Sequence, residues 1–224
     1  MNTTEQKPNV KFQSVTILSN SEIAPSVFIL SFKRNIVFKA GQVLGLAMSP
    51  ADDARLYSIA SGENDENVNI LYNIKPGGKL TPNLAVLKPG DTLYITVPFG
   101  SYTGSSEPAY WIAAGTGIAP FMSMYLSGLG NNKTLLHGSR TFDGFYFSEK
   151  LIADFGNRYV RCCSQQEGEG VYYGRVTQYL ENSVDLPSDQ KYYLCGSAEM
   201  VVECREILLG KGIPFSNIVA EIYF

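Results

Sequence analysis

The stretch Ala113-Ala114-Gly115-Thr116-Gly117-Ile118-Ala119-Pro120 decides how the second half of the chain folds. An apolar, strand-like run at Tyr110–Ala113 precedes it, and a helix-like pattern follows from about residue 120 to 129. Glycines let a backbone turn sharply and approach a phosphate, and a helix N-terminus offers N–H groups to an anion. Proline suits the first helical turn, where no N–H is needed. The stretch predicts a nucleotide-binding strand–turn–helix unit, although a glycine turn of this kind also occurs as a simple tight turn.

Strand-like and helix-like segments alternate through the rest of this half. We expect strands at 110–113, 134–137, 158–162, 191–195 and 218–223, and helices at 120–129, 148–154, 176–181 and 198–210. Such alternation is typical of a parallel sheet with helices on both faces. The segment Gly104-Ser105-Ser106-Glu107-Pro108, just before the first of these strands, has the composition of a linker or hinge.

The first half has a different pattern, in which short runs rich in Val, Ile, Phe and Tyr are separated by turn residues. The expected strands are 11–19, 26–32, 43–48, 56–60, 68–74 and 92–97, with one short helix at 80–87. Many short antiparallel strands favour a small closed barrel. We therefore predict a β + α/β fold: an N-terminal antiparallel six-stranded β-barrel over residues 1–104, then a doubly wound parallel-sheet nucleotide-binding domain over 105–224.

Composition narrows the function classes. A net charge of −3 argues against a nucleic-acid binder, and no apolar run is long enough for a transmembrane helix. The polar N-terminus lacks the apolar stretch of a signal peptide. The four cysteines show no C-x-x-C spacing, so we expect no metal or iron–sulfur site, and a reducing, cytoplasmic location. A one-electron carrier would then be a separate protein.

A second candidate site is Arg55-Leu56-Tyr57-Ser58 in the first half. On a strand, Arg55 and Tyr57 share one face, and Leu56 and Ser58 the other. An Arg can hold a phosphate with its forked donors, and a Tyr can lie flat against an aromatic ring. The same residues would also suit an ordinary barrel strand with a surface Arg and a packed Tyr.

These two stretches, with others in the same order, resemble the ferredoxin–NADP reductases and their relatives. The resemblance covers nearly the whole chain. Besides Arg55–Ser58 and Gly115–Pro120, it is carried by Phe38-Lys39-Ala40-Gly41-Gln42, Gly77-Gly78-Lys79-Leu80-Thr81, Pro89-Gly90-Asp91, Pro98-Phe99-Gly100-Ser101-Tyr102, Leu194-Cys195-Gly196-Ser197 and Glu221-Ile222-Tyr223.

The resemblance implies an FAD site in the barrel. Arg55 would bind the FAD diphosphate with Leu56 beside it, Tyr57 would stack on the isoalloxazine ring, and Ser58 would lie near flavin N5. Lys79, Leu80 and Thr81 would hold the FAD phosphates. The last residues, Tyr223 and Phe224, would cover the flavin as a gate that the nicotinamide displaces. The chain departs from the plant-type terminus because Phe224 follows the Tyr, so either ring is a candidate for the stacked one.

The resemblance also implies a site for the hydride donor, NADPH or NADH. Gly115, Thr116 and Gly117 would meet the nicotinamide nucleotide, and Cys195 and Gly196, at a strand end, would approach the nicotinamide. Cys195 also suits a buried position as a small hydrophobe. Ser58, Cys195, Glu221 and Tyr223 are the expected catalytic residues.

The choice between NADPH and NADH depends on basic residues near the ribose. The second strand of the α/β half ends in His137-Gly138-Ser139-Arg140, without an acidic residue. Ser139 and Arg140 are candidates for a 2′-phosphate site, as is Arg175 in Gly174-Arg175-Val176-Thr177. Each Arg also suits a solvated surface position. Bacterial members of the family usually carry another Arg after the third strand. Here that stretch reads Ser164-Gln165-Gln166, so only Arg140 and Arg175 favour NADPH over NADH.

The leading hypothesis is an FAD enzyme that takes hydride from NAD(P)H and passes single electrons to a separate ferredoxin- or flavodoxin-type carrier. Two alternatives share the fold: an NAD(P)H:flavin reductase that releases its flavin, and the reductase component of a multi-chain oxygenase. A non-catalytic nucleotide-binding module is a third.

Overall fold

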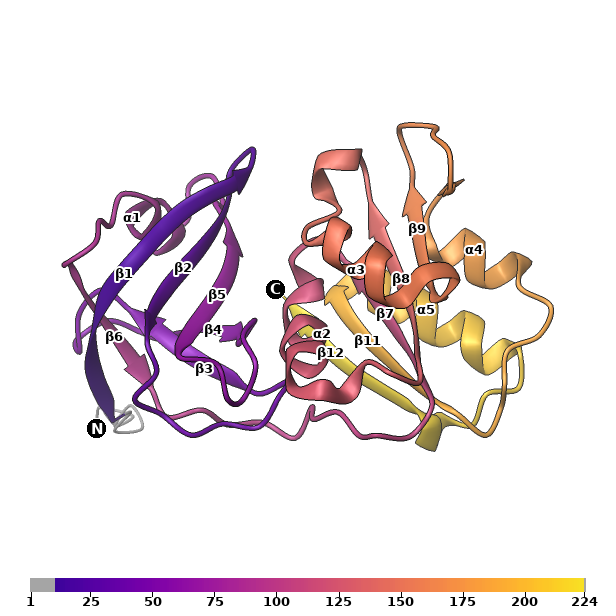
Figure 1. Cartoon of the computed structure of the whole chain (residues 1–224), viewed down its shortest axis with the longest axis horizontal. Coiled ribbons are helices and arrows are strands. Elements are labelled where there is room, and N and C mark those ends of the chain that lie inside the picture. The colour runs from indigo at the N-terminus through magenta and orange to yellow at the C-terminus, as the bar shows by residue number, and fades with distance from the viewer. Residues whose placement is uncertain (1–10, 224) are drawn as a thin grey trace, which may run out of the picture.

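The computed structural model describes residues 11–223, and its first half is built from six antiparallel strands. The strands are β1 (Phe12–Ala24), β2 (Val27–Lys33), β3 (Val43–Ala47), β4 (Arg55–Ser58), β5 (Asn67–Asn73) and β6 (Thr92–Thr96). In β1, the buried Val15 and Ile17 alternate with exposed neighbours, whereas β3 is buried along its whole length. A five-residue helix, α1 (Thr81–Ala85), crosses between β5 and β6 (Figure 1).

The six strands close into a barrel. Their order is β4-β3-β6-β1-β2-β5, and an antiparallel bridge between Ile59 and Ile70 joins the two ends of this order. Closure leaves no long unpaired edge. The interior is filled by fully buried Phe32, Leu44 and Ile95 with their neighbours. The predicted barrel is confirmed.

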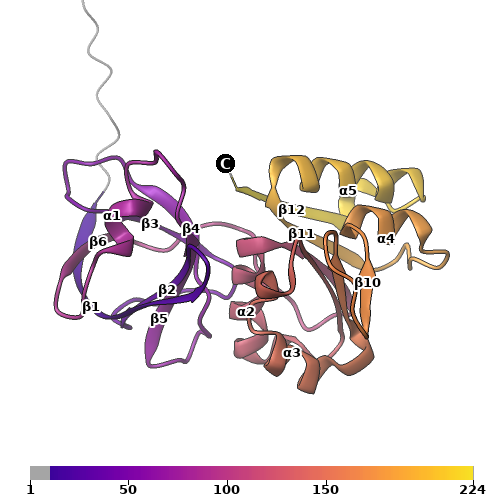
Figure 2. The ribbon, with the colours of Figure 1, turned by 90° about the horizontal axis from the view of Figure 1, so that it is seen from above.

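The second half is a six-stranded parallel sheet in the order β10-β9-β8-β7-β11-β12. The strands are β7 (Ala109–Ala114), β8 (Lys133–Ser139), β9 (Tyr159–Cys163), β10 (Val171–Tyr173), β11 (Lys191–Ser197) and β12 (Ile218–Tyr223). Four α-helices cover it: α2 (Ala119–Met124), α3 (Ser148–Phe155), α4 (Val176–Asn182) and α5 (Ala198–Gly210). Seen from above, α2 and α3 lie on one face and α4 and α5 on the other (Figure 2). The doubly wound arrangement is confirmed.

Three short helical turns complete the α/β half where loops meet regular structure. They are η3 (Phe142–Gly144), η4 (Gly156–Arg158) and η5 (Phe215–Asn217).

Two elements differ from the sequence prediction. The predicted helix 120–129 becomes α2 followed by a π-helical turn, η2 (Tyr125–Leu129), because Gly128 takes a left-handed conformation with φ of 85°. The edge strand β10 was not predicted, since three residues are too few for a periodic pattern to show.

One apolar cluster spans the two halves. Ala40, Ala60 and Leu71 of the barrel pack in a single buried cluster with Trp111, Phe121 and other residues of the α/β half. Gly104 of the connecting segment lies close to the α/β half, because a Cβ on it would lie 2.9 Å from the Leu129 side chain. The boundary at residue 104 stays a prediction. Within residues 11–223, no helix is long and apolar enough to cross a membrane.

Candidate nucleotide cleft and redox site

A cleft of about 1280 Å³ lies at the junction of the two halves. One wall comes from the barrel, from the β1–β2 hairpin at 24–27 and the end of β5 at 73–76. The other wall is formed by the loops that follow β7, β8, β9 and β11 and by the start of α4. Ligands of open parallel sheets bind at the carboxyl ends of the strands. The cleft occupies this edge.

The glycine turn forms the centre of the second wall. Residues Gly115–Ile118 make a 3₁₀ turn, η1, between β7 and α2, and Gly115 and Thr116 line the cleft. Gly117 is buried, and a Cβ at this position would lie 2.2 Å from the Cys195 carbonyl oxygen. Only glycine therefore allows η1 to pack against the end of β11. Pro120 lies in the first turn of α2, as predicted.

Ser139 and Arg140 lie on the loop after β8, and both line the cleft. The Ser139 hydroxyl donates to the Thr141 carbonyl oxygen at 2.7 Å, which shapes the loop. The Arg140 carbonyl oxygen accepts from the Gln165 N–H at 3.0 Å and from the Cys163 thiol at 3.1 Å. The backbone of Arg140 is fixed by these contacts, while its side chain is exposed at the cleft.

The start of α4 supplies Arg175 and Thr177. The Gln178 side chain accepts a hydrogen bond from the Arg175 N–H at 2.8 Å, and the Arg175 side chain is exposed along the cleft. Thr177 is only 2% exposed and also lines the cleft. Within residues 11–223 its hydroxyl has no hydrogen-bond partner. Buried hydroxyls are normally paired, so this one is available to a bound ligand.

The charges around the cleft are mixed. Among the described residues, Lys75, Arg140 and Arg175 line it together with Asp143, Glu199 and Glu203. Both Arg side chains come from the α/β half, and Lys75 faces them from the barrel. These cations and the Thr177 hydroxyl form a donor set that fits the phosphates of a dinucleotide.

Ser58 and Glu221 connect the two halves at the C-terminal end of the chain. The Ser58 hydroxyl donates to a Glu221 carboxylate oxygen at 2.8 Å. Ser58 ends β4, and Glu221 lies on β12 opposite Cys195 of β11. Burial raises the pKa of Glu221 above its ordinary value, and the hydrogen bond from Ser58 opposes this shift in part. Cys195 is fully buried beside them in the sheet.

The other predicted flavin residues lie on the barrel, outside the lining of the cleft. Arg55 and Leu56 are exposed, whereas Tyr57 is half-buried against the barrel core, and burial raises its pKa to about 12. Lys79 is exposed and Leu80 half-buried, just before α1. The Thr81 hydroxyl accepts from the Lys75 N–H at 2.8 Å and so closes the 75–81 turn.

The structure thus gathers the predicted residues in two places. The cleft brings together Gly115, Thr116, Ser139, Arg140, Arg175 and Gly196. Ser58 and Glu221 meet directly, next to Cys195. The backbone of Tyr223 pairs with Ser197 at the end of β12, and Phe224 lies outside the described residues, so the gate hypothesis stays a prediction.

Several cleft residues were not found from the sequence. The β1–β2 hairpin and Lys75 come from barrel turns that carry no nucleotide signal of their own. Glu199 and Glu203 lie one helical turn apart on α5, shortly after Gly196. This spacing puts both side chains on one face of the helix and could have identified them as cleft residues. Thr177 could have been found from its place two residues after the predicted Arg175.

Two family models match the chain. The oxidoreductase FAD-binding domain matches residues 10–103, and the oxidoreductase NAD-binding domain matches residues 111–206. Together they account for most of the chain, in the order in which the barrel and the α/β half occur.

The relatives with known roles are longer proteins. The toluate 1,2-dioxygenase electron transfer component of Pseudomonas putida is 30% identical over 93% of this chain and 65% of its own length. The terephthalate 1,2-dioxygenase reductase component 1 of a Comamonas species is 28% identical over 92% of this chain and 67% of its own length. This chain therefore spans about two thirds of these relatives.

One solved structure shows the same fold over nearly both chains. The ferredoxin NADP⁺ reductase from Neisseria gonorrhoeae, with bound FAD and NADP, aligns with a TM-score of 0.84 at 21% identity. The alignment covers 96% of this chain and 99% of the other. The likeness extends to both halves and to the way in which they are joined.

Proposed function

We propose that this chain moves hydride from NAD(P)H to a bound FAD and passes the electrons on singly. It has an oxidoreductase FAD-binding domain followed by an oxidoreductase NAD-binding domain, and it shares the fold of a ferredoxin NADP⁺ reductase. FAD suits this role since it accepts two electrons together and releases them one at a time. The observation that carries the proposal is that both sites lie between the two halves: the cleft has one wall from each half, and Ser58 of the barrel bonds to Glu221 of the α/β half.

The flavin would be held by the barrel. Arg55, with Leu56 beside it, and Lys79, Leu80 and Thr81 would bind the diphosphate, and Tyr57 would lie against the ring. The exposed guanidinium of Arg55 and the half-buried phenol of Tyr57 lie on the same face of β4, which supports this assignment. Tyr223 and Phe224, at the end of the chain, would cover the ring.

The nicotinamide nucleotide would occupy the cleft. Gly115, Thr116 and Gly117 would bind its phosphates, and Gly196 would let it approach the sheet edge. Arg140 and Arg175, with Ser139, would hold the 2′-phosphate of NADPH. The support is that both Arg side chains are exposed along one wall of the cleft, which Thr177 of α4 also lines with a buried hydroxyl that has no partner among the described residues.

The Ser58 hydroxyl would hydrogen-bond at the flavin position that receives hydride, and Glu221 would orient that hydroxyl. Glu221 is half-buried with a raised pKa, so it holds a proton more readily than an exposed carboxylate does. Cys195 would border the nicotinamide from the end of β11. These groups position the reactants in a site with little water, which hydride transfer requires.

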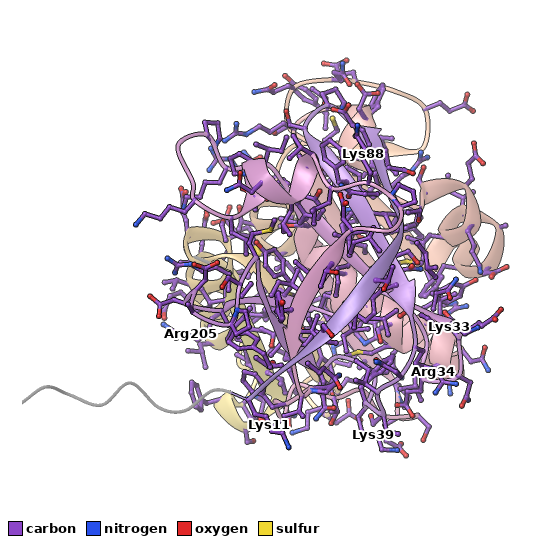
Figure 3. The ribbon with its side chains drawn as sticks, turned by 90° about the vertical axis from the view of Figure 1, so that its left-hand side faces the viewer. Lys11, Lys33, Arg34, Lys39, Lys88 and Arg205 are labelled. Carbon is purple, nitrogen blue, oxygen red and sulfur yellow. The ribbon has the colours of Figure 1, made fainter. Side chains whose placement is uncertain are left out.

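The electron acceptor would be a separate ferredoxin- or flavodoxin-type carrier. The names of the relatives favour a second candidate, in which the chain is the reductase of a multi-chain oxygenase. At the outer end of the barrel, Lys33 and Arg34 lie close to one another (Figure 3), and Lys33 and Lys39 pair with Glu66 and Glu63. Cys162, Cys163 and Cys204 are buried thiols outside any disulfide, which suits a cytoplasmic enzyme.

An absorption spectrum of the purified protein, followed by anaerobic titration with NADPH and then NADH, tests the proposal. A yellow protein whose flavin is bleached by one of them is the expected result. Loss of flavin on gel filtration would favour a flavin reductase. A colourless protein that oxidises neither nucleotide would favour the last alternative, a non-catalytic nucleotide-binding module. Adding ferredoxin, flavodoxin or an oxygenase component to the reduced protein then identifies the acceptor.

A further inference from the structure

We propose that Ser123 is a positioning residue for hydride transfer. Its buried hydrogen bond to the Ser61 carbonyl oxygen would fix the strand that carries Ser58 relative to the glycine turn. The inference rests on the proposed function, and it concerns a residue that lines neither the cleft nor the predicted flavin site.

The bond crosses the interface between the two halves. Ser123 lies on α2 and Ser61 on the barrel segment after β4, and both residues are 0% exposed. The Ser123 hydroxyl donates to the Ser61 carbonyl oxygen at 2.7 Å. The surrounding cluster is apolar and includes Ala60, Phe121 and Met124. Without this donor the Ser61 carbonyl oxygen would be buried and unpaired, which is unfavourable in apolar surroundings. The bond therefore favours one arrangement of the two segments.

On the barrel side, the bond is tied closely to Ser58. Ser61 follows Ser58 by three residues, and the chain between them is held to β5 by a hydrogen bond from the Ala60 N–H to the Asn69 carbonyl oxygen at 2.8 Å. The Asn69 N–H in turn donates to the Ser61 hydroxyl at 3.1 Å. A shift at Ser61 would therefore be transmitted to Ser58.

On the other side, the bond is tied to the nicotinamide wall. Ser123 lies on α2, which begins where the glycine turn η1 ends. Gly117 of that turn packs directly against the backbone of Cys195. The helix, the turn and the end of β11 therefore form one packed unit, which Ser123 connects to the flavin strand.

A second contact at the edge of the interface shows how closely the segments approach. A Cβ on Gly62 would lie 2.9 Å from the Leu126 carbonyl oxygen. Next to it, the Glu63 N–H donates to the Ser127 hydroxyl at 3.0 Å. Ser127 is only half-buried, and its partner Glu63 lies farther along the chain from Ser58 than Ser61 does. The bond between Ser123 and Ser61 is therefore the inner of the two.

Ser123→Ala tests the inference, with NADPH and NADH as the probes. The rate of hydride transfer is sensitive to small displacements of the reactants: about 1 Å can cost about a hundredfold. We expect flavin content and nucleotide affinity within about twofold of wild type, with a hydride-transfer rate constant about tenfold lower in stopped-flow measurements. kcat should therefore fall without a rise in KM. The long-wavelength absorbance from nicotinamide stacked on flavin should weaken in parallel.

Two further variants separate positioning from general stability. Tyr159→Phe removes a buried hydroxyl whose 2.9 Å contact with His137 lies within the α/β half, and it should keep the wild-type rate. Ser123→Cys keeps the size of the side chain and a weak S–H donor, so it should give an intermediate rate. It also supplies the measurement if the Ala variant does not fold.

Rates within about twofold of wild type in both Ser123 variants, or an equal loss of rate in Tyr159→Phe, would overturn the inference. Failure of the proposed function has a different signature: the flavin of the wild-type protein would not be reduced by either nucleotide.

Discussion

The Ser58 hydroxyl and the Glu221 carboxylate, 163 residues apart in the chain, form a 2.8 Å hydrogen bond across the junction of the two halves. Ser58 ends the short strand β4, and Glu221 lies near the end of the last strand, β12. The last strand therefore brings a half-buried carboxyl group to the barrel at the point where the flavin would receive hydride.

Ser58→Ala should slow flavin reduction by about tenfold, because one hydrogen bond made near the transition state is lost. FAD content should be unchanged, since the diphosphate would be held by other residues. Anaerobic stopped-flow absorbance with saturating nucleotide measures the rate. Ser31→Ala, which removes a buried hydroxyl from β2, is the matched control and should behave as wild type. A Ser58→Ala enzyme that is reduced at the wild-type rate would exclude the role.

Glu221 should make stability depend on pH. Its pKa is raised in the folded protein above the ordinary 4.5, so the fold favours the protonated acid. This contribution is complete below pH 4.5 and is lost as the pH rises through the raised pKa. Glu221→Gln, which stays neutral, should not show this loss. Urea unfolding of both proteins from pH 4.5 upward measures it, and parallel curves would contradict the assignment.

His137 should have the opposite effect at acid pH. It is fully buried, and burial lowers its pKa to about 3, from 6.5. The unfolded chain therefore takes up a proton first as the pH falls below 6.5, and stability declines by at most about 1.4 kcal/mol per pH unit until about pH 3. His137→Gln should remove this part of the acid sensitivity in urea unfolding, and equal slopes for the two proteins would refute it.

Arg140→Ala and Arg175→Ala should each raise the KM for NADPH by about tenfold, because each removes a cation that would face the 2′-phosphate. The KM for NADH, which has no such phosphate, should change little. Steady-state kinetics with both nucleotides provide the comparison. Arg161→Ala is the matched control, since this guanidinium donates to the Gly170 carbonyl oxygen at the edge of the sheet. Equal effects on both nucleotides would argue against the phosphate role.

Gly117→Ala should abolish nucleotide binding and leave FAD bound. The new Cβ would lie 2.2 Å from the Cys195 carbonyl oxygen, so the glycine turn must move away from β11. Gly210→Ala is the contrast: a Cβ there meets nothing within 4 Å, and the residue ends α5, outside the lining of the cleft. Fluorescence titration with NADPH distinguishes them, and similar affinities in the two variants would contradict this account.

Much of the fold follows from local pattern in the sequence. The strand Ala109–Ala114 and the helix after it were predicted because an apolar run, a glycine turn and a proline lie in the required order. The site follows less directly. Residue types identified Ser58 and Glu221 only through the family resemblance, and their contact depends on where β12 ends against the barrel. Pairings between distant segments, such as Ser61 with Ser123, leave no local pattern to read.

The apolar cluster that includes Ala40, Ala60 and Leu71 of the barrel and Trp111 of the α/β half has a consequence for cooperativity. Cutting the chain near residue 104 would expose apolar surface on both fragments, so each fragment alone should aggregate. Heating the intact chain should unfold both halves in a single transition. The cleft between the halves is then a preformed binding site, and its width would be fixed when the protein folds, before a dinucleotide binds.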